Sequence, residues 1–231
     1  MDMSRYDRRG YTTVPVKEGY GQWAKTYEDT VEDLMDLRLL DRLQVPDWSH
    51  VSRAVDLACG TGRIGTWLKA HGVGQLDGVD ITPEMLSQAR QRNIYDRLLE
   101  EDLCQTSLPS AHYDLAMAVL VDEHLPGLAP LYSEAARLVM PGGWLMVVGY
   151  HPFFTMMYGI PTHFDGPAGE PLTIQTHVHL LSDHVQAGLR TGWTLRGMDE
   201  GLIDAAWVAR KPQWSPYLHR PVSFAFAWQR R

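Results

Sequence analysis

The sequence predicts an α/β fold in which helices cover both faces of a doubly wound, mostly parallel sheet of seven strands. Three observations support this prediction. Strand-like and helix-like segments alternate from residue 53 to residue 150. The first strand ends in a glycine-rich turn, and the fourth is a near-continuous apolar run typical of a strand covered on both faces. Two more strand patterns close the chain and predict an antiparallel C-terminal strand.

Residues 1–45 predict an arm followed by one long helix. Residues 1–19 mix charged residues with a Thr-Thr-Val-Pro segment, and we expect an irregular arm there. From 20 to 43, apolar residues recur at the three- and four-residue spacing of a helix until Pro46 and its polar neighbours end it. The apolar positions are Trp23, Tyr27, Val31, Leu34, Leu37 and Leu40.

Residues 53–150 form the predicted core of the sheet. A Pro-Gly-Gly turn at 141–143 is expected before the last strand of this part. The expected strands are 53–58, 75–80, a weaker segment before 102, 113–121 and 144–149. The expected helices are 62–71, one that begins with Thr82 as N-cap and Pro83 after it, and 128–139.

The remainder of the chain divides into two parts. Residues 151–180 show no clear period and are rich in aromatic residues, proline and glycine, so we expect an insert after the fifth strand. Residues 181–231 predict a helix capped by Ser182 and ended by Gly192, then strands at 193–202 and 221–228. We interpret the whole chain, 1–231, as a single domain, since 231 residues suffice for one core.

Composition and charge exclude several classes of function. The net charge of −7 and the scattered basic residues disfavour nucleic acid, whose binding depends on clustered Lys and Arg. Two cysteines give no disulfide framework and suit a reducing compartment. No apolar run approaches the roughly 20 residues that span a bilayer, and the first residues lack the apolar stretch of a signal peptide. We therefore expect a soluble cytoplasmic protein with no membrane partner.

One motif carries most of the chemical information. Residues 56–65 read DLACGTGRIG, which contains G-x-G-x-x-G, and Asp80 lies twenty residues after Gly60 at the end of the second strand. The glycines permit a tight turn at a helix N-terminus, and a carboxylate at that distance can accept hydrogen bonds from two ribose hydroxyls. The pattern predicts a ribose-bearing cofactor, and nicotinamide-dependent enzymes use the same geometry.

Three further features choose between cofactors. Asp56 lies at the strand end, where it would repel a pyrophosphate but would welcome a cationic methionine moiety. Asp102 follows the third strand, where a carboxylate can accept from an adenine amino group. The Pro-Gly-Gly turn precedes a strand, and an antiparallel strand pair ends the chain.

With these motifs in this order, the sequence resembles the class I S-adenosylmethionine-dependent methyltransferases. The hexapeptide DITPEM at 80–85 resembles the small-molecule branch that includes the ubiquinone and menaquinone biosynthesis methyltransferases. The resemblance covers residues 20–150 through four motifs, and beyond 150 it concerns only the general layout. It implies a Rossmann-like sheet and S-adenosylmethionine as cofactor.

The resemblance also implies roles for residues near the methionine part of the cofactor. Gly60 and Gly62 would pack against it, and Asp56 would meet its amino group directly or through water. Leu120, at the end of the fourth strand, lies where the family places a backbone carbonyl near that amine. Ala58 stands where a glycine is more usual.

The resemblance assigns the nucleoside part of the cofactor to other residues. Asp80 would hold the ribose hydroxyls, and Ile81 and Met85 would enclose the adenine. Asp102 and the backbone of Leu103 would read the edge of the adenine.

An aromatic N-terminal helix closes over the cofactor in this branch. Tyr20, Trp23 and Tyr27 resemble it. Each can equally belong to a packed helix face.

Three histidines are candidates for a catalytic base. His124 follows the fourth strand and His151 the fifth, and substrates of open α/β sheets sit beyond these strand ends. His163 lies in the insert. A neutral histidine can take a proton from a hydroxyl or amine, although Asp122 and Glu123 are rivals for that role.

The histidines at 177, 179 and 184 predict no metal site. Imidazoles two apart on a strand share a face, but only Asp183 is nearby to add to the set. We expect them to line a pocket or lie at the surface.

The predicted function is in-line methyl transfer from S-adenosylmethionine to a small aromatic or apolar metabolite at an O, N or C atom. The insert carries seven apolar or aromatic residues between 153 and 164 that can line a pocket for it. We expect a small-molecule partner and a monomer or homodimer. The alternatives are a nicotinamide-dependent oxidoreductase, a non-catalytic methyltransferase-like partner protein, or use of the cofactor in a cyclisation.

Overall fold

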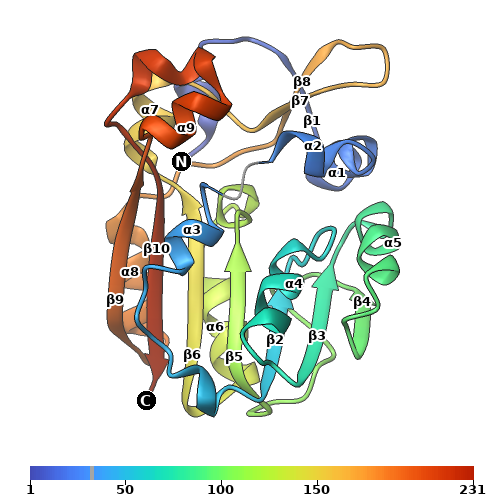
Figure 1. Cartoon of the computed structure of the whole chain (residues 1–231), viewed down its shortest axis with the longest axis vertical. Coiled ribbons are helices and arrows are strands. Elements are labelled where there is room, and N and C mark those ends of the chain that lie inside the picture. The colour runs from blue at the N-terminus through green and yellow to red at the C-terminus, as the bar shows by residue number, and fades with distance from the viewer. Residues whose placement is uncertain (32–33) are drawn as a thin grey trace.

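A computed structural model describes residues 1–31 and 34–231. Within them, the main sheet has seven strands in the order β4-β3-β2-β5-β6-β10-β9 (Figure 1). β10 is antiparallel to both of its neighbours, while the pairs from β4 to β6 are parallel, which confirms the predicted fold class. The strands are β2 Arg53–Leu57, β3 Gln75–Asp80, β4 Arg97–Glu100, β5 Tyr113–Val119, β6 Val139–Tyr150, β9 Trp193–Leu202 and β10 Pro221–Arg230.

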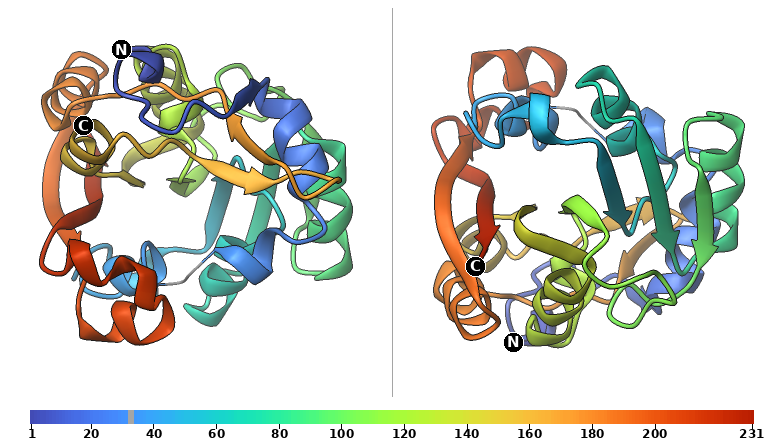
Figure 2. Two further views of the ribbon diagram at one scale, coloured as in Figure 1. Left: turned by 90° about the horizontal axis from the view of Figure 1, so that it is seen from above. Right: turned by 90° about the horizontal axis from the view of Figure 1, so that it is seen from below.

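Helices cover both faces of this sheet, as Figure 2 shows from above and below. Apolar side chains of α6 and α8 pack into one core cluster with β5, β6 and β10. Side chains of α3 and α4 pack into a second cluster on the other face. α5 lies beside β3 and β4. These helices are α3 Leu37–Leu40, α4 Arg63–Ala70, α5 Pro83–Gln91, α6 Ala129–Leu138 and α8 Leu181–Arg190.

Two local predictions about the sheet and its helices are wrong. Residues 141–143 form no separate turn, because β6 begins at Val139 and continues through them with an irregularity in its pairing to β5. Ser182 is not the cap of α8, which begins one residue earlier. There the Asp183 carboxylate accepts the Leu180 amide at 2.8 Å.

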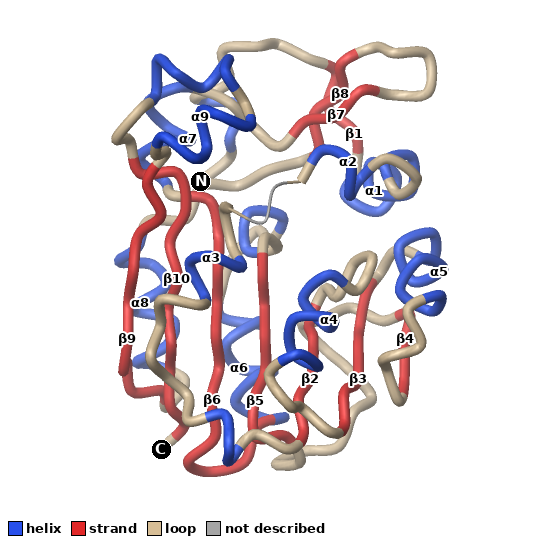
Figure 3. The backbone as a smooth tube through the Cα atoms, viewed as in Figure 1, coloured by secondary structure: helices blue, strands red, loops and turns tan. Residues whose placement is uncertain are grey.

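A second layer lies over the carboxyl ends of the parallel strands (Figures 1 and 3). We call it the cap, and it consists of residues 1–31, 151–180 and 203–220. In the described residues it holds a small sheet in which β8 pairs with β1 and β7. Its elements are β1 Thr12–Val14, α1 Val16–Trp23, α2 Tyr27–Thr30, α7 Pro152–Tyr158, β7 His163–Asp165, β8 Pro171–Ile174 and α9 Ala205–Arg210, with 3₁₀ turns at Met3–Arg5 and Pro212–Tyr217.

The cap corrects the sequence prediction for the arm and the first helix. Residues 1–19 are not irregular, because β1 pairs in parallel with β8 and α1 begins at Val16. The continuous helix expected from 20 to 43 is also wrong. α2 ends at Thr30, Val31 is extended, and α3 is a separate turn, while residues 32–33 of the expected helix lie outside the described residues.

The helix breaks because its apolar residues belong to two different cores. Trp23 packs in the cap with Phe164, whereas Leu39 and Leu40 pack against the sheet with α4. A straight helix cannot reach both cores, although the apolar spacing is compatible with one. Of the helices in the described ranges, none is both long and apolar enough to cross a lipid bilayer.

Candidate functional site

The turn between β2 and α4 brings the motif glycines against the end of β3. Gly60 has φ of 54° and Gly62 has φ of 87°, a region that glycine enters without steric cost. The Asp80 carboxylate accepts the Gly60 amide and the Thr82 amide, each at 2.8 Å. Ala58 has φ of 60°, so this non-glycine residue also adopts the left-handed conformation that the turn demands. The buried carboxylate therefore holds the turn in shape.

A cavity of about 270 Å³, the first cavity, opens beside this turn between the sheet and the cap. It brings together nine of the residues predicted to bind the cofactor. These are Tyr20, Tyr27, Gly60, Asp80, Ile81, Met85, Asp102, Leu103 and Leu120.

The first cavity also has a lining that sequence reasoning missed. Glu101 and Thr82 are sequence neighbours of predicted residues, so the sequence could have indicated them. Lys17, which pairs with Glu100 at 2.8 Å, gave no signal because the arm was predicted to be irregular. The missed residues are Val16, Lys17, Ala58, Thr82, Glu101, Val119, Val121, Leu125 and Pro126, and His124 enters from the catalytic candidates.

Three predicted cofactor residues do not line the first cavity. The Asp56 carboxylate is buried beneath it and accepts the Tyr95 hydroxyl at 2.8 Å. Gly62 is the N-cap of α4. Trp23 lies in the cap, stacked on Phe164 with ring centroids 5.5 Å apart. Their predicted contacts with the cofactor remain predictions.

Asp56 makes the stability of the fold depend on pH. Burial raises its pKa to about 7, against 3.8 for the exposed group, and the Tyr95 hydrogen bond opposes this only in part. Between these values the folded chain binds more protons than the unfolded chain, so the free energy of unfolding falls as pH rises, by up to about 4 kcal/mol. We expect Asp56→Asn to flatten this fall in urea denaturation curves measured from pH 4 to pH 7. If the variant and the wild-type protein show the same dependence of the free energy of unfolding on pH, Asp56 is ionised over this whole pH range.

The residues of the first cavity fit S-adenosylmethionine. No atom lies within 4 Å of the point where a Cβ on Gly60 would stand, so the turn leaves open space against its backbone. Burial raises the pKa of Asp80, and the Thr82 and Gly60 amides oppose that shift. Ile81, 43% exposed, and the buried Met85 give apolar walls suited to a planar base.

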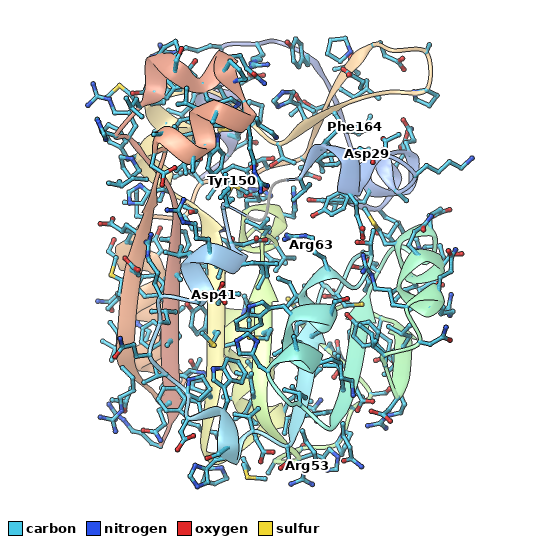
Figure 4. All side chains as sticks on the ribbon, in the orientation of Figure 1. Asp29, Asp41, Arg53, Arg63, Tyr150 and Phe164 are labelled. Atoms are coloured by element: carbon cyan, nitrogen blue, oxygen red, sulfur yellow. The ribbon has the colours of Figure 1, made fainter. Side chains whose placement is uncertain are left out.

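A larger second cavity, of about 580 Å³, lies under the cap. Tyr20, Tyr27 and Leu120 line both cavities, so the two adjoin. Figure 4 labels Tyr150 and Phe164, one from the end of β6 and one from the cap. The aromatic side chains that line the second cavity are Tyr20, Trp23, Tyr27, Tyr150, Phe154, Phe164, Trp207, Trp214 and Tyr217, together with the imidazole of His163.

His124 is the candidate base that lines the first cavity, and it contacts Tyr20, which lines both cavities. Its Nδ1 lies 2.8 Å from the Gln175 carbonyl oxygen, which can only accept, so Nδ1 carries the proton. Its Nε2 then accepts the Tyr20 hydroxyl at 2.8 Å. Burial lowers the pKa of His124 to about 4, so the imidazole is neutral at pH 7.

His163 and His151 have other environments. His163 lines the second cavity, where its Nδ1 donates to the Pro161 carbonyl and its Nε2 faces Arg9 at 3.3 Å.

His151 lines neither cavity. Its Nδ1 accepts the Phe153 amide and its Nε2 lies 2.7 Å from Glu200, so it is the N-cap of α7. His151 follows the end of β6, as predicted from the sequence. Its ring, however, accepts a hydrogen bond from the first turn of α7.

The role of His151 can be tested by truncation. We expect His151→Ala to lower the free energy of unfolding by about 1 kcal/mol, because the Phe153 amide loses its cap. Urea denaturation measures this change. Calorimetric titration should give an unchanged dissociation constant for S-adenosylmethionine, and a weakened one would return His151 to the site.

The other histidines take structural positions. His184 is buried, with Nδ1 3.0 Å from the Tyr132 hydroxyl and Nε2 3.2 Å from Asp122. His179 lies 2.8 Å from the Leu125 carbonyl oxygen. Across the described parts of the chain, no three His, Cys, Asp or Glu side chains gather in a way that could hold a metal ion.

The matches to known proteins concern the same part of the chain. A methyltransferase domain family matches residues 55–147. Methyltransferase-like protein 27 of Homo sapiens is 34% identical over 132 residues, which cover 54% of this chain and 53% of the human protein. A ubiquinone biosynthesis O-methyltransferase of Hydrogenovibrio crunogenus is 31% identical over 98 residues, 39% of each chain. The chain thus spans about half the length of the human relative and less of the bacterial one.

A solved structure shares the fold over nearly its whole length. It is an S-adenosylmethionine-dependent methyltransferase from Mesorhizobium loti, with a TM-score of 0.66 at 22% identity, and the match covers 87% of this chain and 99% of that one. The domain match runs from β2 to β6 and includes the glycine turn and most of the residues that line the first cavity. Residues 55–147 of the chain thus match a methyltransferase domain, and the chain has the fold of S-adenosylmethionine-dependent methyltransferases.

Proposed function

We propose that the chain transfers the methyl group of S-adenosylmethionine to a small molecule with an aromatic or apolar body. The observation that carries this proposal is the shared wall of the two cavities. Tyr20, Tyr27 and Leu120 line both, so a molecule in the aromatic second cavity lies next to a molecule in the first. Alignment of two reactants at near-attack distance is a large part of catalysis for such a reaction.

The bound cofactor supplies a methyl group that is already electrophilic because it is attached to a positively charged sulfur. The chain's own residues bind and align. Asp80 holds the glycine turn and accepts from the ribose, and the aromatic cap excludes water from the second cavity. His124 remains the histidine candidate for a base, because it is neutral, lines the first cavity and contacts Tyr20 of the wall shared by both cavities.

The sheet order argues against a nicotinamide-dependent oxidoreductase. The dinucleotide fold has a parallel order 3-2-1-4-5-6, whereas here the antiparallel β10 lies between β6 and β9. The net charge of −7 argues against a nucleic-acid acceptor. A small-molecule acceptor suits the size and apolar lining of the second cavity.

Isothermal titration with S-adenosylmethionine, its demethylated product and NAD tests the cofactor. We expect micromolar binding of the first two and none of NAD. Transfer of a labelled methyl group to a panel of aromatic alcohols and amines then tests the activity. Binding of NAD alone would support the oxidoreductase. Cofactor binding with no transfer to any panel member would support a non-catalytic or cyclising protein.

A further inference from the structure

A buried carboxyl group lies in the lining of the second cavity. Glu123 follows β5 in a 3₁₀ turn and is only 5% exposed. Ionisable side chains are almost never this buried unless they are paired. We therefore expect each of its two oxygens to accept a hydrogen bond.

The two oxygens of Glu123 have different environments. Oε1 accepts the hydroxyl of Thr162, which comes from the cap. Oε2 has no hydrogen-bond partner within residues 1–31 and 34–231. His124 does not supply one, because its Nε2 is engaged with Tyr20 and lies 3.5 Å from Oε1. Leaving a buried acceptor unpaired is unfavourable, so a ligand that donates a hydrogen bond to this atom would gain affinity.

Glu123 lines the second cavity, and its neighbours along the chain line the first. It is three residues after Leu120, which lines both, and its neighbour His124 is hydrogen-bonded to Tyr20, which also lines both. Burial and the nearby Asp122 raise the pKa of Glu123 well above its usual value, so the group gains from any partner that stabilises its charge. A ligand group that donates to Oε2 would thus lie in the second cavity beside Glu123.

We propose that the acceptor is an aromatic alcohol or amine, and that Glu123 Oε2 accepts the hydrogen bond of its O–H or N–H group and so orients that group toward the first cavity. This assignment rests on the proposed function. A hydrocarbon would leave Oε2 unpaired. An acceptor carboxylate has no hydrogen to donate to Oε2. The aromatic walls hold the ring and the carboxyl selects the donor.

A matched pair of probes tests this assignment without requiring turnover. 2-Naphthol and 2-methoxynaphthalene share the ring and the oxygen, but only the first has a donor. Isothermal titration of each at mildly alkaline pH, with and without the demethylated cofactor, gives two dissociation constants for the wild-type protein. We expect 2-naphthol to bind at least about tenfold more tightly, the effect of one hydrogen bond to a charged group.

Glu123→Gln should remove this preference. The Thr162 hydroxyl would still donate to the side-chain oxygen, which turns the amide NH₂ toward the cavity, and the two probes should then bind within about twofold of each other. Glu18→Gln is the matched control, because Glu18 is exposed on α1, lines neither cavity and should leave the preference at its wild-type value. Binding of the demethylated cofactor by each variant shows that it is folded.

The outcomes separate the two proposals. Equal binding of the probes by the wild-type protein, or a preference that survives in Glu123→Gln, overturns the role of Glu123, whether or not the cofactor binds. Failure of the wild-type protein to bind the demethylated cofactor overturns the proposed function, while the titrations without cofactor still decide whether Glu123 selects a donor.

Discussion

Replacement of Asp80 by alanine is expected to weaken S-adenosylmethionine binding by about a hundredfold. The carboxylate does two things at once, because it faces the first cavity and also accepts the Gly60 and Thr82 amides. Alanine would remove the charge-assisted hydrogen bonds proposed to the ribose and release the glycine turn. Isothermal titration measures the dissociation constant directly.

Asp80→Asn is the matched comparison for this prediction. Asparagine keeps the shape and one acceptor oxygen, so we expect a loss of about tenfold, between wild type and alanine. Both variants should lower the free energy of unfolding by about 1–3 kcal/mol, because a backbone amide loses its partner. Binding by Asp80→Ala within about threefold of wild type would show that the cofactor does not depend on this carboxylate.

Gly65→Ala is expected to destabilise the fold by about 2–4 kcal/mol, although alanine is the better helix former. A Cβ on Gly65 would stand 2.2 Å from the Tyr95 hydroxyl oxygen and 2.5 Å from its Cζ. The same ring also packs against Gly78, where a Cβ would stand 2.9 Å from Tyr95 Cε1. Tyr95 must therefore leave, and the buried Asp56 loses its hydrogen-bond donor. This loss exceeds the gain of about 1 kcal/mol in helix propensity.

A double-mutant cycle isolates this contact. In a Tyr95→Ala background, Gly65→Ala should be neutral or stabilising, because nothing then occupies the space above residue 65. Tyr95→Phe should lower stability by only about 1–3 kcal/mol, since the ring stays and the hydroxyl alone is lost. Urea denaturation at fixed pH measures all of these variants. A Gly65→Ala cost that persists without Tyr95 would place the clash elsewhere.

Local sequence signals predicted which residues lie together at the glycine turn and the end of β3, beside the first cavity. The glycine turn, Asp80 and Ile81 lie within 22 residues of one another along two adjacent strands, and their positions follow from strand ends and glycine spacing. The third glycine of the motif had a less visible role. Gly65 makes room for Tyr95, thirty residues away, and no periodicity links the two.

The cap was harder to predict, because its residues are placed by tertiary packing and not by local sequence patterns. The apolar spacing from 20 to 43 is helical, but tertiary packing divides those residues between the cap and the sheet. His151 has the expected place after β6, yet its ring is engaged by a helix that the aromatic sequence of the insert did not reveal. Glu123 was only a rival candidate, because the local sequence shows neither its contact with Thr162 nor the burial of its unpaired Oε2.

The division between sheet and cap has an evolutionary consequence. The cap walls of the second cavity come from three segments far apart in the sequence, 1–31, 151–180 and 203–220, and all three lie outside the 55–147 match to the methyltransferase domain family. Substitutions there can change the acceptor while the cofactor floor stays intact. Segments 151–180 and 203–220 line the second cavity but not the first, so we expect a chimaera that exchanges these two segments between relatives to change acceptor preference and keep cofactor affinity.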